Sequence, residues 1–244
     1  MLIAHAMIIG GTGIGDRLSS RGGEAFSVPT EFGCLRGKLL EHKGKVIALV
    51  ARHALGHRTP PHAVPYRAMA LGARRLGCSA VLASAAVGSL RPEWAPKTFV
   101  VVSDLVEASG RRQTLFEQSV EHTPCDHLAD VEVQSVLMEE CKAIGAHPVG
   151  PAVYWCADGP RYESPAEIQL MKRLGADVVG MTAGTEAVAM REAGVPYGCL
   201  AVVTNLAAGL APLDGGHQEV VDVMKSVGAR VADVLLASAV RLSQ

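Results

Sequence analysis

Short apolar runs alternate along this chain with longer stretches in which apolar residues recur every three or four positions. Continuous apolar runs are typical of strands buried on both faces, and they predict strands at 6–9, 46–50, 80–87, 99–105, 152–156, 178–181 and 199–204. The helical spacing predicts helices at 64–76, 131–144, 165–174, 185–193 and 217–242. This alternation indicates an α/β domain with a mostly parallel sheet.

Capping residues support several of these boundaries. Ser164 can cap the helix that starts at Pro165, and Glu167 completes a capping box. Glycines that follow helical stretches are expected to end them in the left-handed conformation: Gly77, Gly145, Gly175 and Gly194. The chain has no repeat or Pro/Ser-rich linker, so we expect one domain over residues 1–244. The long polar stretch 110–130 is expected to be functional or to pack against a partner.

Composition narrows the class of protein. Hydrophobic residues make up 49% of the 244 residues and charged residues 19%, which excludes a disordered chain. Lys and Arg number 23 against 24 Asp and Glu, for a net charge of −1. This balance, with only 4% aromatic residues, argues against a nucleic-acid partner. An anion site can still exist locally, since net charge does not determine local potential.

The cysteines, the N-terminus and the length of the apolar runs point to the cytoplasm. The six cysteines contain no C-x-x-C pair, and most lie in or beside apolar runs as small buried residues of a reducing compartment. The N-terminus lacks a basic region and a cleavage site. No uncharged stretch reaches the roughly 20 apolar residues that a membrane span needs. We therefore expect a cytoplasmic protein without membrane contact.

A glycine-rich segment, Ile9-Gly10-Gly11-Thr12-Gly13, follows the first predicted strand. Its backbone N–H groups and the Thr12 hydroxyl can surround an anion, although a plain tight turn explains the glycines equally well. It lacks the Lys of a phosphate-binding loop of the Walker type and fits the dinucleotide pattern poorly.

A second segment, 51–62, follows the strand at 46–50. Arg52 offers a planar fork that matches phosphate, and His53 offers a further polar contact. His53 and His57 have the spacing of zinc ligands on a helix, but Gly56 and the prolines that follow would break such a helix, which argues against a metal site. Arg58 and His62 can equally be solvated loop residues.

Four further segments also follow predicted strands: Ser84–Ser89, Asp158–Ser164, Gly180–Glu186 and Val203–Gly209. In these segments Tyr162 can stack on a planar ligand, and Glu163 can accept hydrogen bonds from ring N–H groups. Asn205 can read a ligand or simply form a turn. Because the carboxyl ends of strands meet at one edge of a sheet, all six segments are expected to share one crevice.

In this order the segments resemble the trimeric purine nucleoside phosphorylases and the 5′-methylthioadenosine/5′-methylthioinosine phosphorylases. The resemblance covers nearly the whole chain and rests on Ile-Gly-Gly-Thr-Gly, Ala-Arg-His, Gly-Pro-Arg-Tyr-Glu, Val-Gly-Met-Thr and Thr-Asn-Leu-Ala-Ala-Gly. It implies a single α/β/α domain around a mixed sheet and a homotrimer. It also implies reversible phosphorolysis of purine nucleosides, with inorganic phosphate as co-substrate and no metal or organic cofactor.

The resemblance assigns a role to individual residues. Its phosphate site corresponds to Thr12, Arg52, His53, the backbone at Ala85 and Ala86, and Thr182. Met181 would contact the ribose, Tyr162 would pack on the purine, and Glu163 and Asn205 would read its edge. Asn205, Arg52 and His53 are the residues expected to carry catalysis. Ala85 departs from the family, which usually has a polar side chain there, and this weakens the expected hold on phosphate.

The base edge favours a 6-oxopurine. Glu163 can accept from N1–H, and the Asn205 amide can donate to O6 or N7. Relatives that cleave 6-aminopurines resemble Thr-Asp-x-Asp at this turn, whereas this chain has Asn205 and Ala207. A missing partner costs about 1–3 kcal/mol. An adenine-specific methylthioadenosine phosphorylase is the alternative, with Asp158 or Asp214 supplying the carboxylate.

Two arrangements are open for the 5′ end of the nucleoside. In one, His217 bonds a 5′-hydroxyl as in hydroxyl-preferring relatives. In the other, Val220, Val223 and Met224 form an apolar pocket for a methylthio group, although their spacing also suits a core stripe. The segment at His122 resembles one that a neighbouring subunit contributes to this pocket.

Two other classes of function remain as alternatives. A dinucleotide-binding oxidoreductase could use the glycine-rich turn, but no acid is suitably spaced at the end of the second strand. A member of the phosphorylase family that has lost catalysis, and only binds ligand, is compatible with Ala85. Phosphate-dependent release of the free base would distinguish an active phosphorylase from both of these alternatives.

Overall fold

A computed structural model of the chain describes residues 3–112, 114–211 and 216–243. Its strands are β1 (Ala6–Gly10), β2 (Glu24–Thr30), β3 (Gly33–His42), β4 (Lys45–Ala51), β5 (Ala80–Ser89), β6 (Phe99–Glu107), β7 (Val149–Cys156), β8 (Val178–Gly180) and β9 (Tyr197–Leu206). Its helices are α1 (Ile14–Ser19), α2 (Tyr66–Leu76), α3 (Val131–Ala143), α4 (Pro165–Arg173), α5 (Ala183–Glu192) and α6 (Gly216–Arg241), with a short 3₁₀ helix, η1 (Pro61–Ala63). All the strands and helices predicted from the sequence are present.

The strands form one sheet in the order β2-β3-β4-β1-β5-β8-β7-β6-β9, and β9 also pairs with β5. The second half of the sheet therefore closes on itself through β5, β8, β7, β6 and β9. Parallel pairs join β1 to β4 and β5, β9 to β5, and β7 to β6 and β8, whereas the other neighbours are antiparallel. The sheet is thus mixed, as the family resemblance implies, with five parallel and four antiparallel pairs among the described strands.

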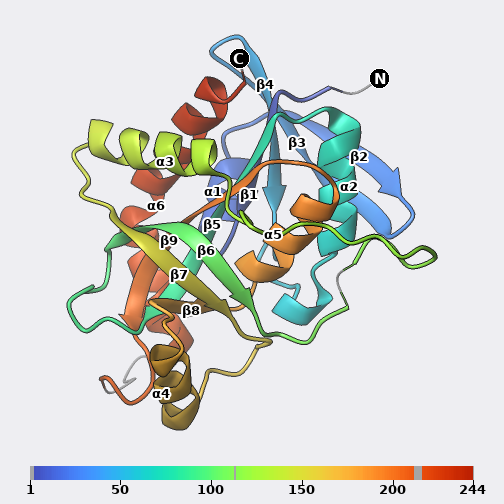
Figure 1. Ribbon diagram of the computed structural model, residues 1–244. Coiled ribbons are helices and arrows are strands. Elements are labelled where there is room, and N and C mark those ends of the chain that lie inside the picture. The colour runs from blue at the N-terminus through green and yellow to red at the C-terminus, as the bar shows by residue number, and fades with distance from the viewer. Residues whose placement is uncertain (1–2, 113, 212–215, 244) are drawn as a thin grey trace.

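Helices cover both faces of the sheet, which gives the α/β/α arrangement (Figure 1). Helices α1, α3 and α6 lie on one face, and α2 and α5 lie on the other. Alternate residues of β1 belong to the two cores, since Ile8 packs on the first side and Ile9 on the second. This burial on both sides explains why the central strands are continuous apolar runs. Helix α4 packs over a small third cluster beside β8.

The sequence prediction missed the hairpin of β2 and β3 and the short helix α1. Only Phe26 and Val28 of β2 are buried, so this edge strand alternates and contains no continuous apolar run. Pro29 is tolerated because β2 is the outermost strand. Helix α1 has six residues, too few to show a helical period.

The capping residues predicted from the sequence are confirmed, and the predicted helix ends agree with the structure to within two residues. Ser164 accepts from the N–H of Glu167, whose side chain accepts from the Ser164 N–H, so the capping box is complete. The four predicted C-terminal glycines all have positive φ. Among the cysteines, Cys78, Cys141, Cys156 and Cys199 are buried as expected, but Cys125 is exposed and Cys34 is half-buried.

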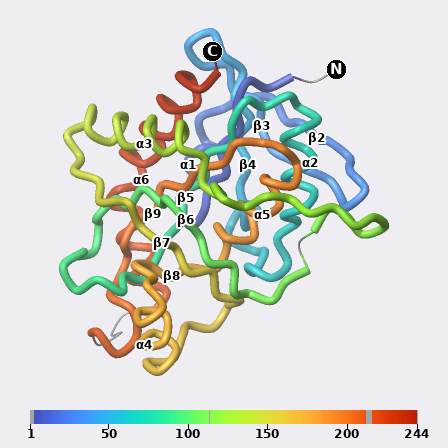
Figure 2. The backbone as a smooth tube through the Cα atoms, viewed as in Figure 1, coloured from blue at the N-terminus to red at the C-terminus, as the bar shows by residue number. Residues whose placement is uncertain are grey.

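The segment between β6 and α3 runs past α5 to the edge of the molecule beyond α2, and then returns (Figure 2). It is tied to α2 by the ion pair of Arg67 with Glu117 and to α5 by the Arg191 side chain, which donates to the Pro124 carbonyl at 2.7 Å. Val120 on this segment is 86% exposed. In the described part of the chain, no helix has the length and hydropathy needed to cross a membrane.

Candidate active site

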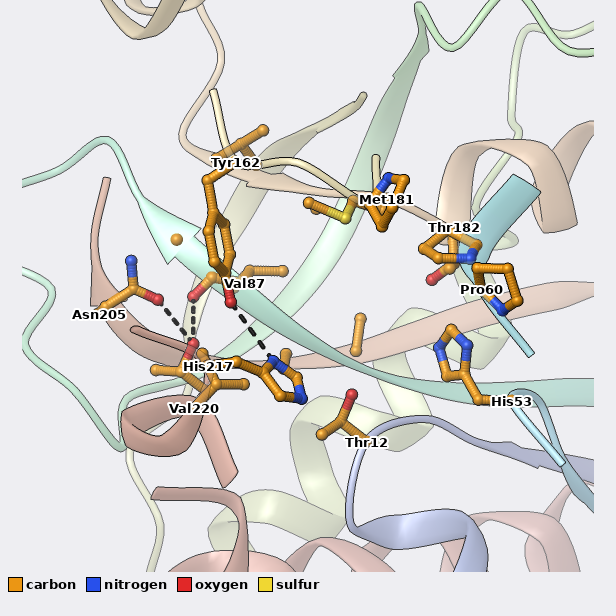
Figure 3. Close-up of a pocket in the computed structure, with 18 of the residues that line it drawn as sticks. Thr12, His53, Pro60, Val87, Tyr162, Met181, Thr182, Asn205, His217 and Val220 are labelled. Carbon is orange, nitrogen blue, oxygen red and sulfur yellow. Dashed lines mark hydrogen bonds between the residues drawn. The ribbon is translucent and has the colours of Figure 1, made fainter. Parts of the chain in front are cut away.

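A cavity of about 560 Å³ opens at the carboxyl ends of the strands. All six chemistry-bearing segments contribute to its wall, as the sequence predicts. Predicted site residues that line it are Thr12, Arg52, His53, Ala85, Ala86, Tyr162, Glu163, Met181, Thr182, Asn205, His217 and Val220. Figure 3 shows most of these side chains converging on one space from β9, from α6 and from the segments that follow β1, β4, β7 and β8.

Three predicted pocket residues lie elsewhere. Met224 is fully buried beneath the glycine-rich loop, where it faces Gly13, and Val223 packs against the core on that side of the sheet. The first turn of α6 reaches the cavity through His217 and Val220, and the next turn descends into the core. His122 is exposed and lies outside the cavity wall. The apolar arrangement expected for the 5′ end is therefore reduced to Val220 within this chain.

The Arg52 side chain is 1% exposed and forms a two-pronged ion pair with Glu186. Its Nε donates to Glu186 Oε1 at 2.5 Å and its Nη2 to Oε2 at 2.8 Å, while Nη1 donates to the Ser84 carbonyl at 2.7 Å. Burial lowers the pKa of Arg52, but the Glu186 carboxylate more than offsets this, so the net shift of the pKa is upward. Arg52 is therefore charged, and its charge is already paired.

His53 is held as a neutral imidazole. Its Nδ1 lies 2.8 Å from the Thr59 carbonyl, which can only accept, so Nδ1 carries the proton and Nε2 is left as an acceptor. Burial, and then the nearby Arg52 charge, lower the pKa of His53 to about 4. At neutral pH His53 can therefore accept a hydrogen bond, and it adds no positive charge.

His57 joins His53 to His217 along one wall of the cavity. The ring centroids of His53 and His57 are 4.5 Å apart, and those of His57 and His217 are 5.4 Å apart. Burial and then the neighbouring His217 lower the pKa of His57. Neighbouring rings are tilted against each other, at interplanar angles of 46° and 31°. In residues 3–112, 114–211 and 216–243, no group of three or more His, Cys, Asp or Glu side chains is arranged to hold a metal ion.

The end of the cavity that lies away from His53 and Thr182 is suited to a planar ligand (Figure 3). Tyr162 is 39% exposed, and its hydroxyl lies 3.4 Å from His217 Nδ1, so these side chains meet across the opening (Figure 3). Burial raises the pKa of the Glu163 carboxyl. The loop that carries both residues packs on Met181, since a Cβ on Gly159 would lie 2.5 Å from the Met181 sulfur.

Asn205 bonds to both of its neighbours. Its Oδ1 accepts from the Thr204 hydroxyl at 2.9 Å, and its Nδ2 donates to the Leu206 carbonyl at 3.0 Å. One of the two Nδ2 protons thus remains for a ligand. Asp158 lines a neighbouring cavity and pairs with Arg111, and Asp214 lies outside the described residues.

Two functional candidates escaped the sequence analysis. Glu186 ends the segment Gly180–Glu186, and a charged residue in the largely apolar first turns of α5 is a sign of buried pairing. Arg111 lies in the polar stretch 110–130, yet its side chain is 9% exposed and donates to the Met181 carbonyl at 2.8 Å and to Thr185 Oγ1 at 3.1 Å. It therefore supports the strand end that carries Met181.

The fold and the cavity define an α/β protein whose ligand site combines an arginine-centred polar end with a wall for a planar group. The family model described as "Phosphorylase superfamily" matches residues 6–240, and this chain belongs to that family.

Individual relatives agree with this assignment. A "Probable 6-oxopurine nucleoside phosphorylase" of Moorella thermoacetica is 37% identical, over 94% of this chain and 90% of the relative. A "Probable S-methyl-5'-thioinosine phosphorylase" of Pseudomonas syringae pv. tomato is 35% identical, over 95% of this chain and 98% of the relative. A crystal structure of a methylthioadenosine phosphorylase from an antarctic soil metagenomic library has a TM-score of 0.89 and 27% identity, over 99% of this chain and 87% of its own.

Proposed function

We propose that this protein cleaves the N-glycosidic bond of 6-oxopurine nucleosides with inorganic phosphate, giving the free purine and ribose 1-phosphate. A phosphate oxygen attacks C1′, the bond from C1′ to N9 breaks, and the electron pair leaves with the purine. The family assignment and the names of the relatives support this reaction. Phosphate is then a co-substrate, and the reaction as proposed needs no metal or organic cofactor.

The observation that carries the base preference is the presence of both Glu163 and Asn205 in the wall of one cavity. A carboxylate accepts from the purine N1–H, and the remaining Nδ2 proton of Asn205 donates to O6 or N7 as the base leaves with negative charge. A 6-aminopurine would need an acceptor at the position of that amide. Among the described residues, the nearby Asp158 is turned to Arg111 and does not supply one.

At the phosphate end, Arg52 and the hydroxyls of Thr12 and Thr182 would bind the nucleophile. The N-terminus of α5 adds a favourable field for an anion. His53 would accept a hydrogen bond from a protonated phosphate oxygen or a ribose hydroxyl. Together these groups orient the nucleophile toward C1′, which is the main contribution a protein can make to this displacement.

At the 5′ end the polar character of the wall favours a hydroxyl over a methylthio group. His57, His217 and the Tyr162 hydroxyl surround this region, and Val220 is the sole member of the predicted apolar set that lines it within the described chain. Cleavage of 5′-methylthioinosine is the second candidate activity, since several relatives carry that name.

A homotrimer is part of the proposal. Val120 of the segment between β6 and α3 is a large apolar residue that is 86% exposed, which supports a contact of this segment with a neighbouring subunit. His122 lies on this segment and would reach the 5′ pocket of that neighbour.

The test is a comparison of inosine, adenosine, 5′-methylthioinosine and 5′-methylthioadenosine at saturating phosphate. We expect inosine to have the highest kcat/KM, followed by methylthioinosine, with both adenine nucleosides at least tenfold lower. Faster cleavage of methylthioadenosine than of methylthioinosine would contradict the proposed base preference. Faster cleavage of methylthioinosine than of inosine would contradict the proposed 5′ preference alone.

A further inference from the structure

We infer that Glu186 is a positioning residue for phosphate, acting through Arg52. The inference rests on the proposed phosphate-dependent function and adds a group that never touches the substrate. Glu186 is 1% exposed and lies in the first turn of α5, directly behind the cavity wall. Its two carboxylate oxygens take the Nε and Nη2 protons of Arg52, at 2.5 and 2.8 Å.

Glu186 is itself fixed from the far side. The Tyr197 hydroxyl donates to Glu186 Oε2 at 2.8 Å, and Tyr197 is 1% exposed. Burial raises the pKa of Tyr197, so this hydroxyl keeps its proton and remains a donor. The result is a buried chain from β9 through α5 to the arginine that follows β4.

The remaining contacts leave Arg52 a single orientation. Its Nη1 donates to the Ser84 carbonyl, and Gly11 stands so close that an added Cβ would lie 2.5 Å from Nη1. Three of the five guanidinium N–H groups are thus committed to the protein, and two remain on a side chain that lines the cavity. Such a fixed fork is organised for an anion before the anion arrives.

The ion pair of Arg52 with Glu186 also determines which interactions bind phosphate. Because Glu186 compensates the charge of Arg52 and His53 is neutral, phosphate depends on directional hydrogen bonds more than on net positive charge. Loss of the Glu186 carboxylate would add net positive charge to the site, but it would also leave the Arg52 guanidinium free to change its orientation. In a buried, directional site we expect the loss of orientation to dominate, so phosphate binding should weaken.

The experiment compares Glu186→Gln, Tyr197→Phe and the control Asp177→Asn with the wild type. Gln keeps the shape of Glu186 but presents an amide N–H to an arginine N–H. Asp177 is itself buried and pairs at 2.6 Å with Arg91, whose side chain is 46% exposed, and Asp177 does not line the cavity. For each protein, KM for phosphate, KM for inosine and kcat are measured, and inorganic phosphate alone is titrated by calorimetry.

We expect Glu186→Gln to raise both the KM and the Kd for phosphate at least tenfold, with KM for inosine within twofold of the wild type. Tyr197→Phe, which leaves the ion pair in place, should raise the phosphate values about threefold. Asp177→Asn should lower stability and leave both KM values unchanged.

Phosphate affinity that is unchanged or tighter in a folded Glu186→Gln protein would overturn the inference, and so would an equal rise of both KM values. If Glu186→Gln does not fold, Tyr197→Phe decides, and an unchanged phosphate Kd in that variant overturns it. A wild type that neither binds phosphate nor requires it would instead refute the proposed function.

Discussion

Replacing Asn205 by Asp should move the base preference from 6-oxopurine toward 6-aminopurine nucleosides. In the variant, the Thr204 hydroxyl keeps an acceptor, but an oxygen now takes the position of the Nδ2 group that donates to the Leu206 carbonyl at 3.0 Å. The same change removes the N–H that would reach O6 and introduces an acceptor for an exocyclic amino group.

The magnitude follows from these contacts. Asn205→Asp moves the unpaired buried polar group from the 6-amino substrate to the 6-oxo substrate, and one such group is worth about 1–3 kcal/mol. The ratio of kcat/KM for adenosine to that for inosine should therefore rise by about 1–3 kcal/mol, or roughly fivefold to 150-fold. Loss of the bond to Leu206 should also lower the free energy of unfolding by about 1 kcal/mol.

The assay measures kcat/KM for inosine and adenosine with the wild type, Asn205→Asp and Asn205→Ala. The alanine variant removes both local hydrogen bonds without adding an acceptor, so it should lose activity on both substrates and retain only the part of the inosine preference that Glu163 supplies. If the aspartate variant loses the same factor on both substrates as the alanine variant does, Asn205 serves only to shape the turn, and the proposed base recognition is refuted.

Three further predictions concern the phosphate end and the assembly. Arg52→Ala should raise KM for phosphate more than tenfold with little change in KM for inosine, and an unchanged phosphate KM would contradict this. In urea unfolding, the free energy of unfolding should fall by about 3–5 kcal/mol, because Glu186 is left buried without its partner. Lowering the pH from 7 to 5 should destabilise the wild type by about 2 kcal/mol more than it destabilises His53→Gln. In the unfolded chain the imidazole has its ordinary pKa of 6.5 and binds a proton in this range, whereas the folded imidazole, with a pKa of about 4, does not. Equal losses of stability in the two proteins would show that His53 is not held neutral. Sedimentation equilibrium should give a mass about three times 25.5 kDa, and a fully active monomer would refute the trimer.

The central part of the fold is predictable because its strands are buried on both faces. Residues such as Ile8 and Ile9 face different helical layers, so both positions must be apolar and the run is unmistakable. The hairpin of β2 and β3 carries no such signal, since one of its faces is exposed. The edge hairpin adds two antiparallel pairs, and the pairs of β5 with β8 and of β6 with β9 are antiparallel as well.

The location of the site is also predictable, because the order of strands brings their carboxyl ends together and each segment there has its own polar signal. What the sequence could not reveal are contacts between distant elements. Arg52 and Glu186 are far apart in the chain, and only packing of α5 against the sheet shows that the arginine is already paired. Likewise the spacing of Val220 and Met224 fits a pocket wall and a core stripe alike, and the depth of α6 decides between them.

Phosphate dependence of inosine cleavage tests the central claim most directly. The purified protein is incubated with inosine in a buffer freed of phosphate and again with added phosphate, and hypoxanthine and ribose 1-phosphate are both quantified. The account predicts that hypoxanthine appears only with phosphate, with one ribose 1-phosphate formed for each base released. Equal release of hypoxanthine without phosphate, with free ribose as the second product, would contradict it and make the protein a hydrolase.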